Sequence, residues 1–164
     1  MRIFNEEQRF TQTWLITLMA IQAIIGIIVI SNEFFESSRR DVTSFIIGLV
    51  VIIVATSFIF LFKLKTRIDE VGIHYQFFPF HLKLKTIFWD QIKTAKPRTY
   101  DAFSEYGGYG LKGGFFWKKD KGTAVNVSGD KGIQLTLKSG KKILIGTLRI
   151  NDVEAVINRY FNKN

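Results

Sequence analysis

Two long apolar runs dominate the first 64 residues. They extend from Trp14 to Ile30 and from Val42 to Leu64, and the second has no charged residue before Lys63. A helix rises about 1.5 Å per residue and a bilayer core is about 30 Å thick, so roughly 20 apolar residues cross it. We therefore predict transmembrane helices at 11–31 and 42–64, joined by an extracytoplasmic loop at 32–41.

The first run has a second interpretation as a secretory signal peptide. Its apolar stretch exceeds the usual core of about 7 to 15 residues. Ser31, Asn32 and Glu33 follow it, where a small-residue cleavage site would be expected. An uncleaved signal anchor is the better interpretation.

Small and polar residues on both runs predict that the helices pack as an antiparallel hairpin. Packing in lipid depends on small residues that let backbones approach and on polar side chains between helices. Ser44, Gly48 and Ala55 form such a stripe on the second run, and Gln22 lies near the middle of the first. We interpret Gln22 as a packing residue of the hairpin, with contact to another copy or a polar path as alternatives. Neither span holds an ionisable residue at depth, which argues against a proton-coupled transporter.

After Leu64 apolar and polar residues alternate between turn residues, which is typical of β-strands. The predicted strands are 66–70, 73–78, 82–89, 91–96, 123–127, 132–137 and 141–148. Pro97 is expected to stop the fourth strand.

The chain closes with a helical pattern at about 151–161. Asn151 is its predicted cap, and one face of the helix carries Val153, Val156, Ile157 and Tyr160.

The first ten residues mix Ile3, Phe4 and Phe10 with charged residues. For residues 1–10 we predict an interfacial helical turn on the cytoplasmic side that leads into the first span, with a partner-docking arm as the alternative.

Basic residues are concentrated after the second run. From Lys63 onward, 19 Lys and Arg stand against 9 Asp and Glu, whereas the first 62 residues hold 4 against 5. Basic segments next to spans stay in the cytoplasm. We therefore predict a multi-pass protein of the cell (inner) membrane with both termini cytoplasmic. The β domain at 65–164 would lie beside the anionic leaflet, so lipid rather than nucleic acid is the expected polyanion.

Three short pieces carry a resemblance to a known family: IFWDQI at 87–92, EYGGYG at 105–110 and LIGT at 144–147. With the order of the elements, they resemble the bacterial pleckstrin-homology-like domains attached to small membrane proteins, over Leu64 to Phe161. The resemblance implies an antiparallel β-sandwich or barrel of about seven strands, plugged by the C-terminal helix, without enzyme activity. Phosphoinositide-binding relatives have a basic first hairpin. Here the turn is Asp69 to Gly72, so that specificity is not carried over.

The segment from Thr99 to Gly122 interleaves glycines with aromatic residues. Gly108, Gly110 and Gly113 match a GxGxxG spacing, but no helix pattern follows, so the match is accidental. The segment is open to three interpretations: an edge strand with a loop, a membrane-touching loop, or a protein-docking edge. Its candidate lipid or partner contacts are Lys112, Phe115, Phe116, Trp117, Lys118, Lys119 and Lys121.

No catalytic, cofactor or metal site is predicted. The chain has no cysteine, and His74 and His81 lack the spacing of metal ligands. We expect a non-enzymatic, membrane-anchored interaction or scaffold module that binds a protein partner, another copy of itself as a homo-oligomer, or the anionic leaflet. The alternative is an oligomeric subunit whose hairpins line a pore or support a transporter, with Thr17, Gln22 and Thr56 on a shared axis. An enzyme comes third.

Overall fold

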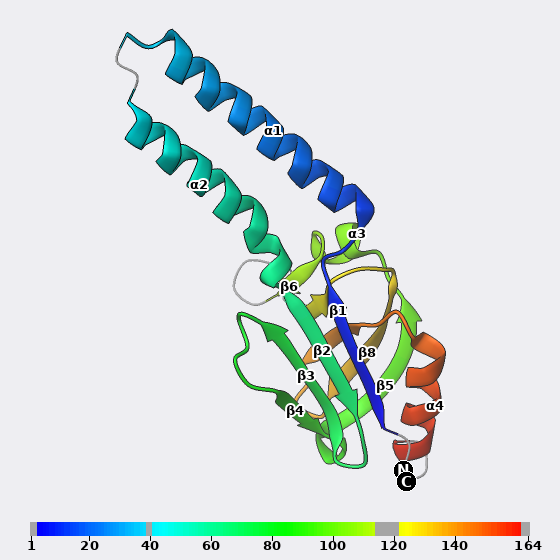
Figure 1. The fold of residues 1–164 in the computed structure, drawn as a ribbon. Coiled ribbons are helices and arrows are strands. Elements are labelled where there is room, and N and C mark those ends of the chain that lie inside the picture. The colour runs from blue at the N-terminus through cyan, green and yellow to red at the C-terminus, as the bar shows by residue number, and fades with distance from the viewer. Residues whose placement is uncertain (1–2, 39–40, 114–121, 162–164) are drawn as a thin grey trace. The chain divides into compact units, whose positions relative to one another are not determined.

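The computed structural model describes residues 3–38, 41–113 and 122–161 (Figure 1). The chain divides into two compact units. Phe10–Phe62 forms a helical unit, and Met1–Arg9 together with Lys63–Asn164 forms a β unit.

The helical unit consists of two helices and a short 3-10 turn. These are α1 (Thr13–Glu36), α2 (Val42–Phe58) and η1 (Ile59–Leu61). Both helices are long and apolar enough to cross a membrane, as expected. Because neither Gly nor Pro interrupts the sequence after residue 31, α1 continues to Glu36, five residues beyond its predicted end. Asp41 caps α2 by accepting the N–H of Thr43 at 3.0 Å.

The two helices meet along a stripe that contains one glycine on each side. A Cβ built on Gly26 would lie 3.0 Å from Cδ1 of Ile52, and one built on Gly48 would lie 3.5 Å from Cδ1 of Ile30. The other predicted packing residues, Gln22, Ser44 and Ala55, are exposed in this hairpin. At about 100° per residue, each of the three lies within about 40° of Gly26 or Gly48 around its helix, so they border the stripe without being covered by the other helix. The Ser44 hydroxyl instead donates to Asp41 at 2.6 Å.

The residues before α1 form a strand of the β unit. Strand β1 (Phe4–Arg9) pairs antiparallel with β2 (Lys63–Ile68), with Phe4 opposite Ile68 and Arg9 opposite Lys63. Figure 1 shows β1, in dark blue, beside β2. The predicted helical turn at 1–10 is therefore wrong. Phe4 and Gln8 are buried while the residues between them are more exposed, which is the alternation of a strand.

Nine strands form two sheets in the described part of the chain. The first sheet has the order β1-β2-β3-β4 and the second has the order β5-β8-β9-β7-β6. Beyond β1 and β2, the strands are β3 (Gly72–Phe78), β4 (Lys85–Phe88), β5 (Ile92–Thr99), β6 (Gly110–Lys112), β7 (Thr123–Asn126), β8 (Lys131–Leu137) and β9 (Lys142–Gly146). All seven expected strands are present, and β1 and β6 are additional.

Three expectations differ from the structure: the purely antiparallel pairing, the barrel alternative to a sandwich, and the end of the fourth strand at Pro97. Strand β7 pairs parallel with β9, so the second sheet is mixed rather than antiparallel. The described strands also leave two separate sheets, not a closed barrel. Pro97 does not stop β5 but lies within it, opposite Ile133. A proline is tolerated there because β5 is an edge strand.

The C-terminal helix covers the core of the β unit. Helix α4 (Ile150–Tyr160) buries Val153, Val156 and Ile157, the face expected from the sequence. Asn151 is not its cap, because the helix begins one residue before it. The Thr147 hydroxyl accepts the N–H of Arg149 at 3.1 Å, and this turn starts the helix early. A second short helix, α3 (Ala102–Tyr106), lies in a segment for which no helix was expected.

Strand β1 also binds the chain close to its other end. The Glu6 carboxylate accepts the Thr147 hydroxyl at 2.6 Å and the N–H of Leu148 at 2.9 Å. The Gln8 amide donates to the carbonyl of Gly146 at 3.0 Å. Strand β1 is thus hydrogen-bonded to the end of β9 and to the connection between β9 and α4.

We expect Glu6→Ala to lower the free energy of unfolding of the β unit by about 2 to 3 kcal/mol, because it removes two charge-assisted hydrogen bonds and leaves the buried Thr147 hydroxyl without its acceptor. Chemical unfolding of the full chain in detergent, followed by near-ultraviolet circular dichroism, measures this. Glu7→Ala is the matched control. It removes only surface ion pairs to Arg9 and Lys65 and should cost at most about 1 kcal/mol. Equal losses in the two variants would contradict the proposed role of β1.

Candidate functional site

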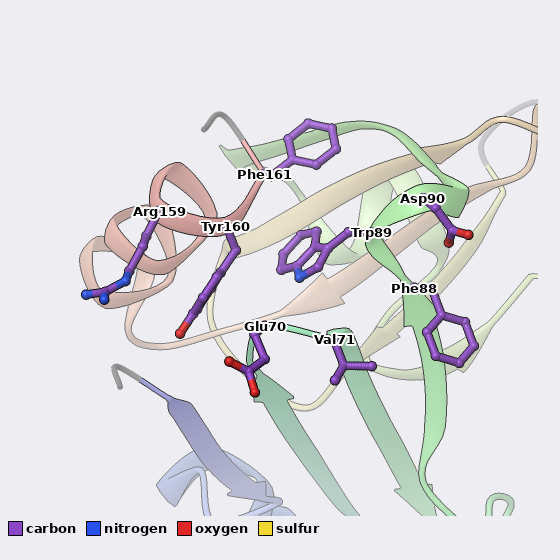
Figure 2. A pocket seen from close by; sticks show the side chains of 8 residues that line it. All are labelled: Glu70, Val71, Phe88, Trp89, Asp90, Arg159, Tyr160 and Phe161. Carbon is purple, nitrogen blue, oxygen red and sulfur yellow. The ribbon is translucent and has the colours of Figure 1, made fainter. Parts of the chain in front are cut away.

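An open groove of about 890 Å³ lies at one end of the β unit (Figure 2). Three parts of the chain form it: the β2–β3 turn, the junction between β4 and β5, and the end of α4. The lining residues are Glu70, Val71, Phe88, Trp89, Asp90, Arg159, Tyr160 and Phe161.

One wall of the groove is a cluster of aromatic rings around Trp89. The Trp89 ring stacks on Tyr160 with 6.4 Å between centroids and lies 5.9 Å from the ring of Phe161. Its Nε1–H donates to the carbonyl of Asp69 at 2.9 Å, which fixes the orientation of the indole. Figure 2 shows Trp89 and Tyr160 side by side above Glu70 and Val71. The wall is therefore built on a hydrogen-bonded ring, which is typical of a preformed binding surface.

Asp69 holds the turn that carries Glu70 and Val71. Its carboxylate accepts the N–H groups of Val71 at 3.0 Å and of Gly72 at 3.4 Å. It also accepts Nε of Arg67 at 2.9 Å and pairs with Nε2 of His74 at 3.0 Å. Burial raises the pKa of Asp69, but the hydrogen bonds from His74 and from the turn outweigh it and lower the pKa below its usual range. Asp69 is therefore an ionised structural residue, as its turn position suggested.

Thr86, His74 and Asp69 form a line that looks like the hydroxyl, imidazole and carboxylate of a hydrolase. Nδ1 of His74 lies 2.8 Å from the Thr86 hydroxyl and Nε2 lies 3.0 Å from Asp69. However, His74 and Thr86 are direct cross-strand partners of β3 and β4, and the carboxylate already serves the turn. Cross-strand hydrogen bonds of this kind are ordinary sheet contacts. We therefore interpret the contacts among Thr86, His74 and Asp69 as interactions that stabilise the first sheet.

The rim of the groove is acidic although the β unit as a whole is basic. Glu70 and Asp90 are exposed at the rim beside the aromatic wall. The guanidinium of Arg159 lies 5.9 Å from the ring of Tyr160, so the wall already contacts one cation. Aromatic faces and carboxylates both attract cations, and a Lys or Arg side chain satisfies the two together. The groove is thus suited to a basic side chain on an extended segment.

The contact residues expected from the sequence do not line this groove. Lys112 is half-buried in β6, the edge strand of the second sheet. Phe115, Phe116, Trp117, Lys118, Lys119 and Lys121 lie outside the described residues. Trp89, Tyr160 and Phe161 were not expected to form a site, because their approach depends on where α4 packs. The available signals were Trp89 in the IFWDQI piece and the adjacent aromatic residues Tyr160 and Phe161 at the end of the predicted helix.

The two histidines have structural roles in this fold. Within the described residues, no group of three or more His, Cys, Asp and Glu side chains gathers as a metal site would require. His81 is buried in the β3–β4 connection, where its Nδ1 accepts the N–H of Phe77 at 3.3 Å. Burial, and secondarily the charge of Lys85, lowers the pKa of His81 below its ordinary value.

This shift predicts a pH dependence of stability. The unfolded chain protonates His81 more readily than the folded chain does, so acid favours unfolding. The free energy of unfolding should be unaffected by His81 above about pH 6.5 and should fall below it, by at most about 1.4 kcal/mol per pH unit. Thermal unfolding in detergent between about pH 5 and pH 8 checks this. The His81→Asn variant keeps a hydrogen-bond acceptor but has no titrating group at this position, so its free energy of unfolding should fall less steeply with decreasing pH. An equal slope in the variant and the parent chain would show that the fold does not lower the pKa of His81.

Comparisons with protein-family models and with curated proteins found no match to this chain. The likeness to pleckstrin-homology-like domains therefore rests on the three short pieces and on the order of elements.

Proposed function

We propose that this chain is a non-enzymatic, membrane-anchored interaction module whose β unit binds a segment of a partner protein in the aromatic groove. The observation that carries the proposal is the pairing of a hydrogen-bonded aromatic wall with the rim carboxylates Glu70 and Asp90. The occupant is an extended segment that places a Lys or Arg side chain against Trp89 and Tyr160.

Anchoring follows from the two apolar helices and from the strands on either side of them. Arg9 ends β1 and Lys63 begins β2, and the two residues are directly paired. If α1 and α2 both cross the bilayer, the segments before and after them lie on the same side, because they belong to one sheet. The excess of Lys and Arg after the second helix supports the cytoplasmic side of the cell (inner) membrane.

The groove lies at the end of the first sheet that is remote from these connections. Strand β2 begins at Lys63, next to the helical unit, and the turn after it carries Glu70 and Val71 into the groove. Its six residues span roughly 20 Å at about 3.3 Å each. Within the β unit the groove is therefore about one strand length away from Lys63, the residue at which the chain enters this unit.

The pleckstrin-homology-like fold is part of this proposal. Two packed sheets with a C-terminal helix against the core are compatible with it, and such domains serve as binding modules. The parallel pair β7–β9 and the strand contributed from before α1 are the features that depart from the expected pattern.

The pore-lining alternative has less support. It needs Thr17, Gln22 and Thr56 on one axis. Thr17 and Gln22 are five positions apart and so are rotated by about 140° from each other on α1. Thr56 is half-buried one helical turn after Ile52, on the stripe that packs against α1, and its hydroxyl donates to the carbonyl of Ile52 at 2.7 Å.

We expect the double variant Glu70→Lys, Asp90→Lys to reduce partner binding about tenfold, because it reverses the charge at the rim and leaves the aromatic wall in place. The measurement is quantitative co-purification of the full chain from native membranes in mild detergent. The matched control, Asp130→Lys with Glu154→Lys, makes the same charge change at exposed carboxylates outside the groove and should bind like the parent chain. An equal loss in the control, or no stable partner and no self-association, would refute the proposal.

A further inference from the structure

We propose that the β3–β4 connection, Pro79–Leu84, docks onto the anionic leaflet from which the second helix emerges. In this arrangement its apolar side chains enter the interfacial layer and the neighbouring lysines contact lipid headgroups. The inference rests on the anchoring part of the proposed function, and it adds a second contact surface with a ligand of its own.

Three large apolar side chains project from this short connection. Phe80, Leu82 and Leu84 are 63%, 78% and 50% exposed. Exposed apolar residues elsewhere in the β unit are more scattered. An apolar cluster that the fold leaves uncovered marks a surface that meets something other than water.

Hydrogen bonds hold the backbone of the connection so that these side chains cannot simply fold inward. The side-chain amide of Gln76 donates to the carbonyls of His81 and Leu82 at 3.0 and 2.9 Å. The N–H of His81 donates to the carbonyl of Phe77 at 2.8 Å, and the buried His81 ring accepts the N–H of Phe77. The ring of Phe80 stacks on Phe77 at 6.0 Å. The connection is thus built around His81, with the apolar side chains displayed outward.

The charge along the connection itself is positive only; the nearest acidic side chains, Glu6 and Glu7 of β1, line a pocket with Leu84, and Glu7 is paired with Lys65 at 3.3 Å. Lys83 and Lys85 alternate with Leu82 and Leu84, and the sequence from Gly72 to Trp89 contains no acidic residue. The ammonium group of Lys63 lies 5.6 Å from the centroid of the Phe78 ring, at the start of the connection. Apolar side chains flanked by lysines match the interface of an anionic leaflet, where apolar groups enter below the headgroups and each cation gains from the surface potential.

The covalent structure places the connection close to a membrane that holds the second helix. Phe78 is directly paired with Lys63, and Lys63 follows Phe62, the last residue of the helical unit. Neighbouring strands are about 4.8 Å apart. Pro79 therefore begins only one strand spacing away from the residue that leaves the span. The headgroup layer extends roughly 5 to 8 Å beyond the hydrocarbon core, a distance comparable to one strand spacing, so the connection is close enough in the chain to reach it.

Site-directed spin labelling tests the docking directly, because the chain contains no cysteine. The full chain with Leu82→Cys is labelled and reconstituted into phosphatidylcholine vesicles with and without phosphatidylglycerol. The label's accessibility to oxygen is compared with its accessibility to a water-soluble nickel complex. Val71→Cys is the control, since Val71 is 48% exposed at the other end of the same sheet.

We expect the oxygen-to-nickel ratio at position 82 to exceed that at position 71 by several-fold, and more so with phosphatidylglycerol. Adding Lys83→Gln and Lys85→Gln should lower the ratio of docked to free states by about fivefold for each lysine. Lys138→Gln with Lys141→Gln, two exposed lysines of the β8–β9 turn, should leave it unchanged. A label at position 82 as water-accessible as the one at 71 would overturn the proposal. So would spin–spin broadening that grows with the protein-to-lipid ratio, because a second copy would then cover the loop.

A third label separates this outcome from a failure of anchoring. Ser38 is exposed in the connection between α1 and α2. In oriented vesicles, a membrane-impermeant maleimide should reach Ser38→Cys and Val71→Cys from opposite sides. If both react from the same side, the hairpin does not span and both proposals fail. If they react from opposite sides while position 82 remains in water, only the loop proposal fails.

Discussion

The antiparallel pairing of β1 with β2 is the constraint around which the rest of the molecule is arranged. It joins two strands that are separated in the sequence by the whole helical unit. Both connections to the helices leave from the paired residues Arg9 and Lys63, so the two ends of the helical segment are held close together. A helical hairpin satisfies this requirement, because α2 packs antiparallel to α1, with Gly26 against Ile52 and Gly48 against Ile30, and so returns the chain towards the start of α1.

This constraint also gives the two ends of the first sheet different surroundings and different chemistry. At the end that continues into the helices, the side chains are basic and apolar, with Lys63 and Lys85 near exposed leucines. At the other end, Glu70 and Asp90 border a wall of aromatic rings. A net-charge argument treats the whole domain as one basic surface. The structure separates it into a basic end suited to lipid and an acidic rim suited to a cationic side chain.

The parts of the fold that depend on local patterns could be predicted from the sequence. The helices follow from the length of the apolar runs, and the strands after Leu64 follow from alternation between turn residues. Strand β1 was missed because it is short and rich in charge, and its partner strand lies beyond both helices. The parallel pairing of β7 with β9 and the meeting of Trp89 with Tyr160 depend on tertiary packing. No periodicity in a single sequence records such contacts.

The hydrogen bonds between β1 and the residues just before α4 have a consequence for how the protein is made. Glu6 precedes both helices in the sequence, whereas its partners Thr147 and Leu148 follow both helices and all nine described strands. Strand β1 can therefore make these hydrogen bonds only after both helices and the last strand, β9, have been synthesised. If only one helix crossed, β1 would be left on the far side of the bilayer from its partners. In a membrane, completion of the β unit would thus require that both helices cross or that neither does, and a chain with a single crossing would expose an unfinished sheet to proteolysis.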